Sequence, residues 1–154
     1  MDRKLRVLII DDAPANIKML GQALKDYYQV IVANNGQAGL KICQSDNPPD
    51  LILLDINMPE MDGYEVCQRL KSVDSTSSIP VIFLTANDTP GEEERGLELG
   101  AVDFITKPFS IPLVMTRVEA HLRNSKLTNI LRGLQKAAPE EIPGLLSGCR
   151  WLAE

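Results

Sequence analysis

Five polar residues of this chain could act together in phosphoryl-transfer chemistry. Each stands at the end of a short apolar or β-branched run, and such runs are typical of strands. The five are Asp11, Asp12, Asp55, Thr85 and Lys107. Ligands of open parallel sheets bind outside the carboxyl ends of the strands. The sequence therefore predicts that these side chains converge on one edge of a sheet.

Three carboxylates at such an edge require a compensating cation. Two unit charges about 4 to 6 Å apart repel by about 3 to 4 kcal/mol at an effective dielectric near 20. Mg²⁺ typically binds one or two carboxylates, keeps several waters and leaves room for phosphate oxygens. No His or Cys occupies these positions, which disfavours Zn²⁺. Lys107 and Thr85 add a positive charge and a hydroxyl donor, so the set suits phosphoryl transfer with a carboxylate nucleophile.

The spacing of apolar residues along the chain predicts the strands and helices that must position these residues. Short β-branched or Leu/Ile-rich runs alternate with helical patterns five times, which indicates βα units around a parallel sheet. The expected strands are Arg6–Ile10, Val30–Ala33, Leu51–Leu54, Val81–Leu84 and Phe104–Thr106. The first, third and fourth runs are almost wholly apolar, as in strands covered by helices on both faces. We therefore expect an α/β fold with a doubly wound sheet between two helical layers.

Helical patterns fill the intervals between these strands. The first helix starts near Pro14, a residue suited to a first turn. The stripe expected to face the sheet consists of Ile17, Leu20, Leu24 and Tyr27. Further helices are expected over 37–45, 63–72, 90–99 and from 110 onward.

Some polar and sulfur-containing residues have a structural interpretation. Asp62, followed three residues later by Glu65, resembles a capping arrangement and is left out of the site. His121, the one histidine, is expected to be a partly exposed helix residue, and a lone histidine disfavours Ser/His or Cys/His catalysis. The three cysteines lack C-x-x-C spacing, so we expect them to be reduced and mostly buried. They are Cys43, Cys67 and Cys149.

The last thirty residues continue a helical stripe beyond the point where the domain is complete. The stripe contains Leu127, Ile130, Leu131 and Leu134, and Pro139, Pro143 and Gly144 interrupt the chain after it. We expect a domain over residues 1–124 and a helical tail or linker stub over residues 125–154. Such a stripe could pack back on the domain, dimerise as a short coiled coil or lead to an output domain.

Composition excludes several classes of protein. The 154 residues leave room for one domain plus a tail, and 44% hydrophobic with 24% charged residues is typical of a globular chain. The net charge of −5 gives no basic footprint, so direct nucleic-acid binding is not expected. The apolar runs are only about a strand long, so no membrane span is expected. Without a signal-peptide pattern, the expected location is the cytoplasm.

Four segments together resemble the receiver domain of two-component response regulators. They read VLIIDD at 7–12, DLILLDINMPEMDG at 50–63, VIFLTA at 81–86 and GAVDFITKPF at 100–109. The resemblance covers about residues 4–124 in the right order. It implies a flavodoxin-like five-stranded parallel sheet of order 2-1-3-4-5.

The resemblance also implies a phosphoacceptor and a metal site. Asp55 would accept a phosphoryl group from a phosphohistidine on a sensor histidine kinase or phosphotransfer protein. Asp11, Asp12 and Asp55 would hold Mg²⁺ together with the backbone carbonyl of Asn57. Asn57 and Asn87 occupy the two variable positions that tune loss of the phosphoryl group in the family.

Three further residues acquire switching roles from the same resemblance. Lys107 would pair with the phosphoryl oxygens, and Thr85 would hydrogen-bond one of them after transfer. Phe104 falls at the aromatic switch position, for which ordinary core packing is the alternative interpretation. The Lys107–Pro108 peptide bond matches one that is cis in the family, which sequence alone would not indicate.

The leading hypothesis is a phosphorylation-controlled switch that catalyses only its own phosphorylation and dephosphorylation. One alternative is a Mg²⁺-dependent aspartyl-phosphate phosphohydrolase. Those enzymes use an Asp two residues after the nucleophile as general acid, and this chain has Asn57 there. A second alternative is a flavodoxin-like cofactor carrier, although clustered acids would repel a phosphate-bearing flavin. A further expectation is homodimerisation through the helix predicted from residue 110 onward and through the tail.

Overall fold

A five-stranded parallel sheet forms the centre of the molecule. The computed structural model of the chain describes residues 4–86 and 90–136. Within them the strands are β1 Arg6–Ile10, β2 Gln29–Ala33, β3 Leu51–Asp55, β4 Val81–Thr85 and β5 Asp103–Thr106. Their order is β2-β1-β3-β4-β5, and every neighbouring pair is parallel. The predicted α/β class and strand order are confirmed, and Asp55 and Thr85 prove to be the last residues of their strands.

The composition of each strand follows its place in the sheet. All residues of β1, β3 and β4 are buried, whereas the edge strand β2 is partly exposed. Alternate side chains of β1 enter different cores, since successive residues of a strand point to opposite faces. Leu8 and Ile10 belong to one apolar cluster, and Val7 and Ile9 belong to the other.

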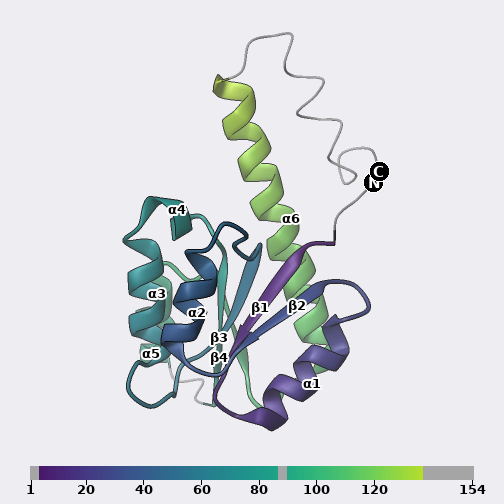
Figure 1. Ribbon diagram of the computed structural model, residues 1–154, viewed down its shortest axis with the longest axis vertical. Coiled ribbons are helices and arrows are strands. Elements are labelled where there is room, and N and C mark those ends of the chain that lie inside the picture. The colour runs from purple at the N-terminus through teal and green to yellow at the C-terminus, as the bar shows by residue number, and fades with distance from the viewer. Residues whose placement is uncertain (1–3, 87–89, 137–154) are drawn as a thin grey trace.

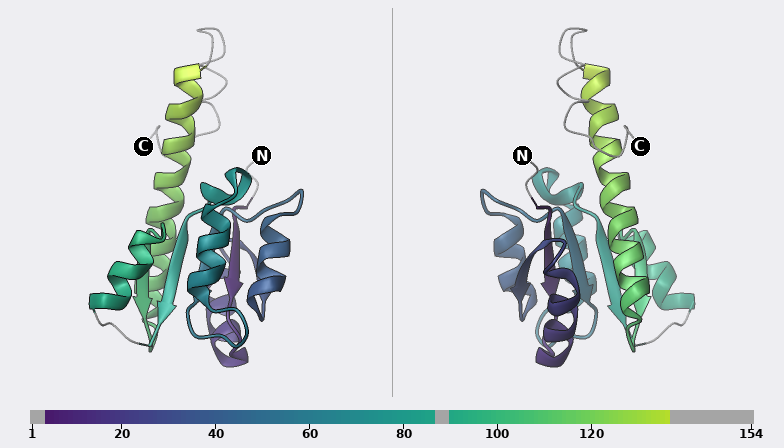
Figure 2. Two further views of the ribbon diagram at one scale, coloured as in Figure 1. Left: turned by 90° about the vertical axis from the view of Figure 1, so that its left-hand side faces the viewer. Right: turned by 90° about the vertical axis from the view of Figure 1, so that its right-hand side faces the viewer.

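Helices cover both faces of the sheet (Figures 1 and 2). On one face lie α1 Pro14–Leu24 and α6 Ile111–Lys136, and on the other lie α2 Gly36–Cys43, α3 Gly63–Lys71 and α5 Pro90–Glu98. Among the described helices, none combines the length and hydropathy that a membrane span requires. The doubly wound arrangement predicted from the apolar strands is therefore present.

The short helix α4 Asp74–Ser77 was not predicted, because four residues are too few to show a helical period. Side chains rather than a buried stripe hold this segment. The Thr76 hydroxyl donates to the Leu70 carbonyl at 2.6 Å, and Lys71 Nζ donates to the carbonyls of Ser77 and Ile79 at 2.9 and 2.7 Å. Burial lowers the pKa of the Lys71 ammonium.

Helix α1 buries its predicted stripe except at the last position. Leu20 and Leu24 are fully buried, and Ile17 packs against the same cluster. Tyr27 was wrongly placed in the stripe, since its side chain is 66% exposed. The physical reason is that α1 ends at Leu24, so helical spacing no longer applies, and the neighbouring Tyr28 packs on the core instead.

Two cysteines lie where the sequence indicates. Cys43 of α2 and Cys67 of α3 are free thiols in the core. Burial raises the pKa of Cys43 to about 12, so this thiol stays protonated and unreactive. Cys149 falls outside the described residues.

Helix α6 is continuous from Ile111 to Lys136 and crosses the expected boundary at residue 124 without a break. Its first half anchors the helix, because Val114, Val118 and Leu122 are buried in the core. Its second half projects beyond the amino ends of the strands (Figures 1 and 2). There the Leu131 side chain is 60% exposed, which leaves an apolar position without cover from the domain.

The remaining residues of the predicted tail stripe divide into two groups. Leu127 and Ile130 are partly buried. The side chain of Leu134 lies outside the described part of the chain, as do Pro139, Pro143 and Gly144. The domain limits therefore stay a prediction.

The first residue of β5 is tied to α6 by a cluster of polar contacts. Asp103 Oδ2 accepts from Arg117 Nη1 at 2.5 Å and lies 2.9 Å from His121 Nε2, while its Oδ1 accepts from the Phe104 amide at 2.8 Å. Burial opposes ionisation of Asp103, but these hydrogen bonds outweigh it and the pKa of Asp103 lies below its ordinary value. His121 is a partly exposed helix residue as predicted, although its partner was not foreseen.

We expect Asp103→Asn to lower the free energy of unfolding at pH 7 by about 1 kcal/mol, because charged hydrogen bonds are lost. A depressed pKa gives stability that is present above the unfolded pKa and is lost as pH falls through the folded pKa. The difference between the two proteins in urea unfolding should therefore shrink at acid pH.

Glu119→Gln is the matched control for this prediction, since Glu119 pairs with Arg123 on the exposed side of the same helix. Its effect should stay within about 0.5 kcal/mol. An Asp103→Asn variant as stable as the Glu119→Gln variant at pH 7 would contradict the role given to this cluster.

Candidate functional site

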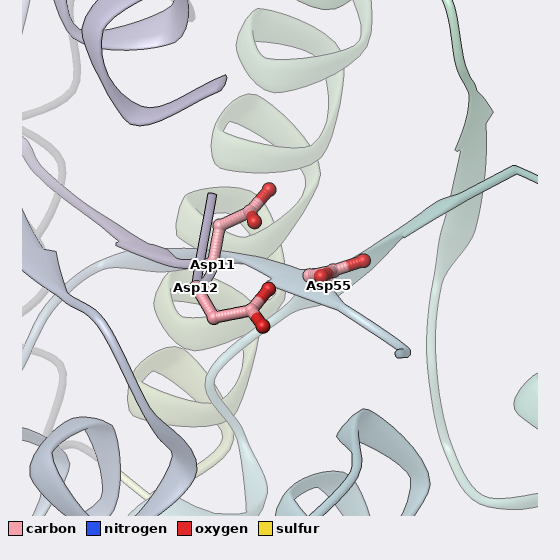
Figure 3. A group of neighbouring side chains, drawn as sticks. All are labelled: Asp11, Asp12 and Asp55. Carbon is pink, nitrogen blue, oxygen red and sulfur yellow. The ribbon is translucent and has the colours of Figure 1, made fainter. Parts of the chain in front are cut away.

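Three carboxylates meet at the carboxyl edge of the sheet (Figure 3). Asp11 and Asp12 directly follow β1, and Asp55 ends β3, the neighbour of β1 in the sheet. Their ligand oxygens all lie within 4.8 Å of one another. Asp11 and Asp55 are buried, whereas Asp12 is exposed, so the cluster has one side open to solvent.

Lys107, which directly follows β5, brings a positive charge to this cluster. Its Nζ lies 3.0 Å from Asp55 Oδ1 and 4.0 Å from Asp11 Oδ2. The backbone N–H of Lys107 donates to the Thr85 carbonyl at 2.7 Å, which fixes the turn after β5 against the end of β4. The Lys107–Pro108 bond is cis, as the family resemblance implied.

The charge state of Asp55 reflects its surroundings. Burial is the main cause that raises the pKa of Asp55 to about 6, and the negative charges of Asp11 and Asp12 raise it further. The hydrogen bond and charge of Lys107 act in the opposite direction but do not cancel these effects. One ammonium is therefore too little positive charge for three neighbouring carboxylates.

The donor set fits a hard divalent cation such as Mg²⁺. The cluster offers only carboxylate oxygens, which Mg²⁺ prefers, and its excess negative charge favours binding. Asp11, Asp12 and Asp55 would hold the ion. Asn57 is exposed and lies two residues after Asp55 in the loop before α3, where its backbone carbonyl could serve as a further ligand.

Asp11 is held in place by neighbours that sequence reasoning missed. The Ala13 amide donates to Asp11 Oδ1 at 2.9 Å, and Asn16 Nδ2 donates to Asp11 Oδ2 at 3.2 Å. The Asp11 amide donates in turn to the Ala33 carbonyl at the end of β2. Asn is common in the first turn of a helix, so the sequence alone could not indicate the contact of Asn16 with Asp11.

Gly63 is a second residue that sequence reasoning missed, because a glycine at the start of a predicted helix does not by itself indicate a role at the site. A Cβ atom at Gly63 would lie 2.4 Å from the Asp55 carbonyl oxygen and 2.8 Å from Ile56 Cα. The Gly63 amide donates to the Ile56 carbonyl at 2.8 Å. The loop from Asp55 to α3 is therefore folded so tightly over the end of β3 that only glycine fits. Asp62 caps α3 by accepting from the Glu65 amide at 2.9 Å, which agrees with its exclusion from the site.

Thr85 and Phe104 occupy the strands beside the acid cluster. Thr85 is 1% exposed, and its hydroxyl lies 3.5 Å from Glu92 Oε2 in α5. The partly buried Phe104 ring stacks on Phe83 with centroids 5.9 Å apart. Thus Thr85 lies at the same sheet edge as Asp55, while Phe104 packs inward against the core that α5 covers. Asn87 falls outside the described residues.

We expect Asp55→Asn to gain stability relative to the natural chain as pH rises from 4 to 7 in metal-free buffer. The raised pKa of Asp55 gives stability that is complete below the unfolded pKa, near 4, and is lost as pH rises through about 6. Asn carries no such charge. The gain should be about 1 to 2 kcal/mol, because the open side of the cluster screens part of the full shift.

Urea unfolding at several pH values in the presence of a chelator measures this gain. Added Mg²⁺ should stabilise the natural chain more than the Asp55→Asn variant. A constant difference between the two proteins from pH 4 to 7 would refute the electrostatic account of the site.

We expect Gly63→Ala to lower the free energy of unfolding by about 2 kcal/mol and to weaken Mg²⁺ binding, because backbone atoms must shift beside Asp55. Gly21→Ala is the matched control, since a Cβ there meets nothing within 4 Å in the middle of α1. That substitution should stabilise the protein by about 0.5 to 1 kcal/mol. Calorimetric Mg²⁺ titration and urea unfolding test both variants, and an unaltered Gly63→Ala protein would contradict the tight-loop interpretation.

Comparison with known proteins places this geometry in a family. The family model for the response regulator receiver domain matches residues 7–119. A probable cyclic di-GMP phosphodiesterase of Vibrio cholerae is 49% identical over 81% of this chain, and the response regulator PleD of Caulobacter vibrioides is 40% identical over 93%. These matches cover 28% and 31% of the two relatives, so the chain spans less than a third of their length.

A solved structure gives the same result. The crystal structure of a putative response regulator from Chloroflexus aurantiacus has a TM-score of 0.74 and 31% identity, and the match covers 78% of this chain and 98% of that one. The family model spans most of the sheet and reaches into α6, and it includes all three clustered carboxylates and Lys107. This chain belongs to the receiver-domain family of response regulators.

Proposed function

We propose that the domain accepts a phosphoryl group on Asp55 from a phosphohistidine of a sensor histidine kinase or phosphotransfer protein. The observation that carries the proposal is the position of Asp55, which is buried beside two further carboxylates and lies 3.0 Å from the ammonium of Lys107. Such a carboxylate can act as a nucleophile while neighbouring groups balance the charge of the incoming phosphate. Membership of the receiver-domain family supports the same reaction.

Each residue of the proposed site has a defined task in this transfer. Asp55 attacks phosphorus through a carboxylate oxygen, the O–P bond forms, and the P–N bond to the donor imidazole breaks, leaving the imidazole to take up a proton. Lys107 orients the Asp55 carboxylate and meets the phosphoryl oxygens. Bound Mg²⁺ would supply charge neutralisation for the carboxylates and the phosphate, held by Asp11, Asp12, Asp55 and the carbonyl of Asn57. The chain turns over no other substrate in this proposal.

The proposed switch follows from the new charge at Asp55. A phosphoryl group adds negative charge and acceptor oxygens, and the Thr85 hydroxyl turns to donate to one of them. Phe104, which packs on Phe83 beside α5, would rearrange as β4 and α5 adjust. Moving a population from 1:99 to 99:1 takes about 5.5 kcal/mol, which a few charge-assisted hydrogen bonds can supply.

The proposed partners follow from the surfaces of the domain. The phosphodonor must approach the acidic edge, and a second copy could pair along α6 and the tail, where Leu131 is exposed. The similarity to a probable cyclic di-GMP phosphodiesterase makes an enzymatic output one candidate for a longer protein that contains this domain. We infer a cytoplasmic setting and no direct contact with nucleic acid or membrane.

We expect a small phosphodonor such as acetyl phosphate to label the natural chain with one phosphoryl group, and only in the presence of Mg²⁺. Intact-mass spectrometry should detect no labelling of Asp55→Asn and strongly reduced labelling of Lys107→Ala and Asp12→Asn. Asp62→Asn is the matched control, because this nearby acid caps α3 and should leave labelling intact. Equal labelling of Asp55→Asn would reject the proposal, and turnover of phosphate esters would favour the phosphohydrolase alternative.

A further inference from the structure

Helix α5 carries a carboxylate, Glu92, that faces the hydroxyl of Thr85. The Thr85 Oγ1 atom lies 3.5 Å from Glu92 Oε2, within hydrogen-bonding distance. Glu92 is half-buried in the first turn of α5, and Thr85 is buried at the end of β4. The function proposed above needs this hydroxyl for a phosphoryl oxygen at Asp55 and gives Glu92 no task.

Aromatic contacts hold Glu92 in this place. The Tyr64 hydroxyl of α3 donates to the Glu92 backbone carbonyl at 3.4 Å, and the Arg95 guanidinium lies 4.2 Å from the centroid of the Tyr64 ring. Gly96, the residue after Arg95 in α5, is packed so closely that a Cβ atom there would come within 2.7 to 2.9 Å of the rings of Phe104 and Phe83. The first turns of α5 are therefore pressed against α3 and the ring pair, which brings the Glu92 carboxylate to Thr85.

Thr85 cannot serve Glu92 and a phosphoryl group equally well. A hydroxyl has a single proton, so its donation to an ionised carboxylate weakens its donation elsewhere. A phosphoryl group on Asp55 would therefore compete with Glu92 for this proton.

We propose that Glu92 is a positioning residue that holds Thr85 in its unphosphorylated arrangement, so that switching requires release of the Thr85–Glu92 contact. This inference rests on the proposed function of Asp55 and Thr85. Because Glu92 lies in the first turn of α5, release of the contact removes one of the restraints on that turn. The contact thus sets how readily a phosphoryl group at Asp55 shifts α5.

The test uses beryllofluoride with Mg²⁺, a phosphoryl analogue that binds to aspartate, on the full chain. Weakening of the Thr85–Glu92 contact should favour the bound state, and the net contribution of one hydrogen bond corresponds to about a three- to tenfold change in affinity. Glu92→Gln and Glu92→Ala should therefore bind beryllofluoride about three- to tenfold more tightly than the natural chain in a thermal-shift or NMR titration.

Glu93→Gln is the matched control, because Glu93 lies in the same turn, carries the same charge and is also half-buried. Its affinity should stay within about twofold of the natural chain. A Thr85→Val background removes the hydroxyl, so the effect of Glu92→Gln should disappear there. A purely structural role for Glu92 would not depend on the Thr85 hydroxyl in this way.

The outcomes separate this inference from the proposal on which it rests. No beryllofluoride binding by any variant, the natural chain included, would overturn both. Binding by the natural chain with an unchanged Glu92→Gln affinity would overturn this inference alone. Equal shifts in Glu92→Gln and Glu93→Gln, or a shift that persists with Thr85→Val, would do the same.

Discussion

The repulsion among three carboxylates at one sheet edge is the constraint on which the rest of this structure depends. The order β2-β1-β3-β4-β5 makes β1 and β3 neighbours, so Asp11 and Asp12 necessarily meet Asp55. Lys107 reaches Asp55 although β4 lies between their strands. The loops are built around this cluster, because the buried Asp11 and Asp55 must keep a fixed geometry despite their charge. An acidic site left short of positive charge attracts a cation.

The same edge also connects the acid cluster to helix α5. Thr85 ends β4, which pairs with β3, so Thr85 and Asp55 lie on adjacent strands. The hydroxyl of Thr85 faces Glu92, and Gly96 of the same helix contacts the stacked rings of Phe104 and Phe83. Close-packed groups shift between discrete arrangements more readily than they deform. These contacts connect the strand beside Asp55 to α5 without a break.

The sequence was sufficient for the strands and for the residues at their ends, but not for contacts between distant segments. Apolar runs such as Leu51–Leu54 leave little choice of structure, and the carboxyl ends of parallel strands share one edge. The strand order came only from the family resemblance, because hydrophobic periodicity predicts strands but not which strands pair with each other. The Gly63 contact and the Asp103–His121 pair depend on tertiary approach. Tyr27 was misplaced because helical spacing cannot show where a helix ends.

The two ends of β5 are held by different parts of the domain, which restricts the movement of this strand. At its amino end Asp103 is tied to Arg117 and His121 of α6, and just past its carboxyl end Lys107 meets Asp55. The projecting half of α6 lies at the opposite edge of the sheet from the acid cluster (Figures 1 and 2). Val114, Val118 and Leu122 bury the first half of α6 in the core, where the helix also packs against α1 and β3. A displacement of β5 would therefore strain both the contacts of Asp103 with α6 and the ion pair of Lys107 with Asp55.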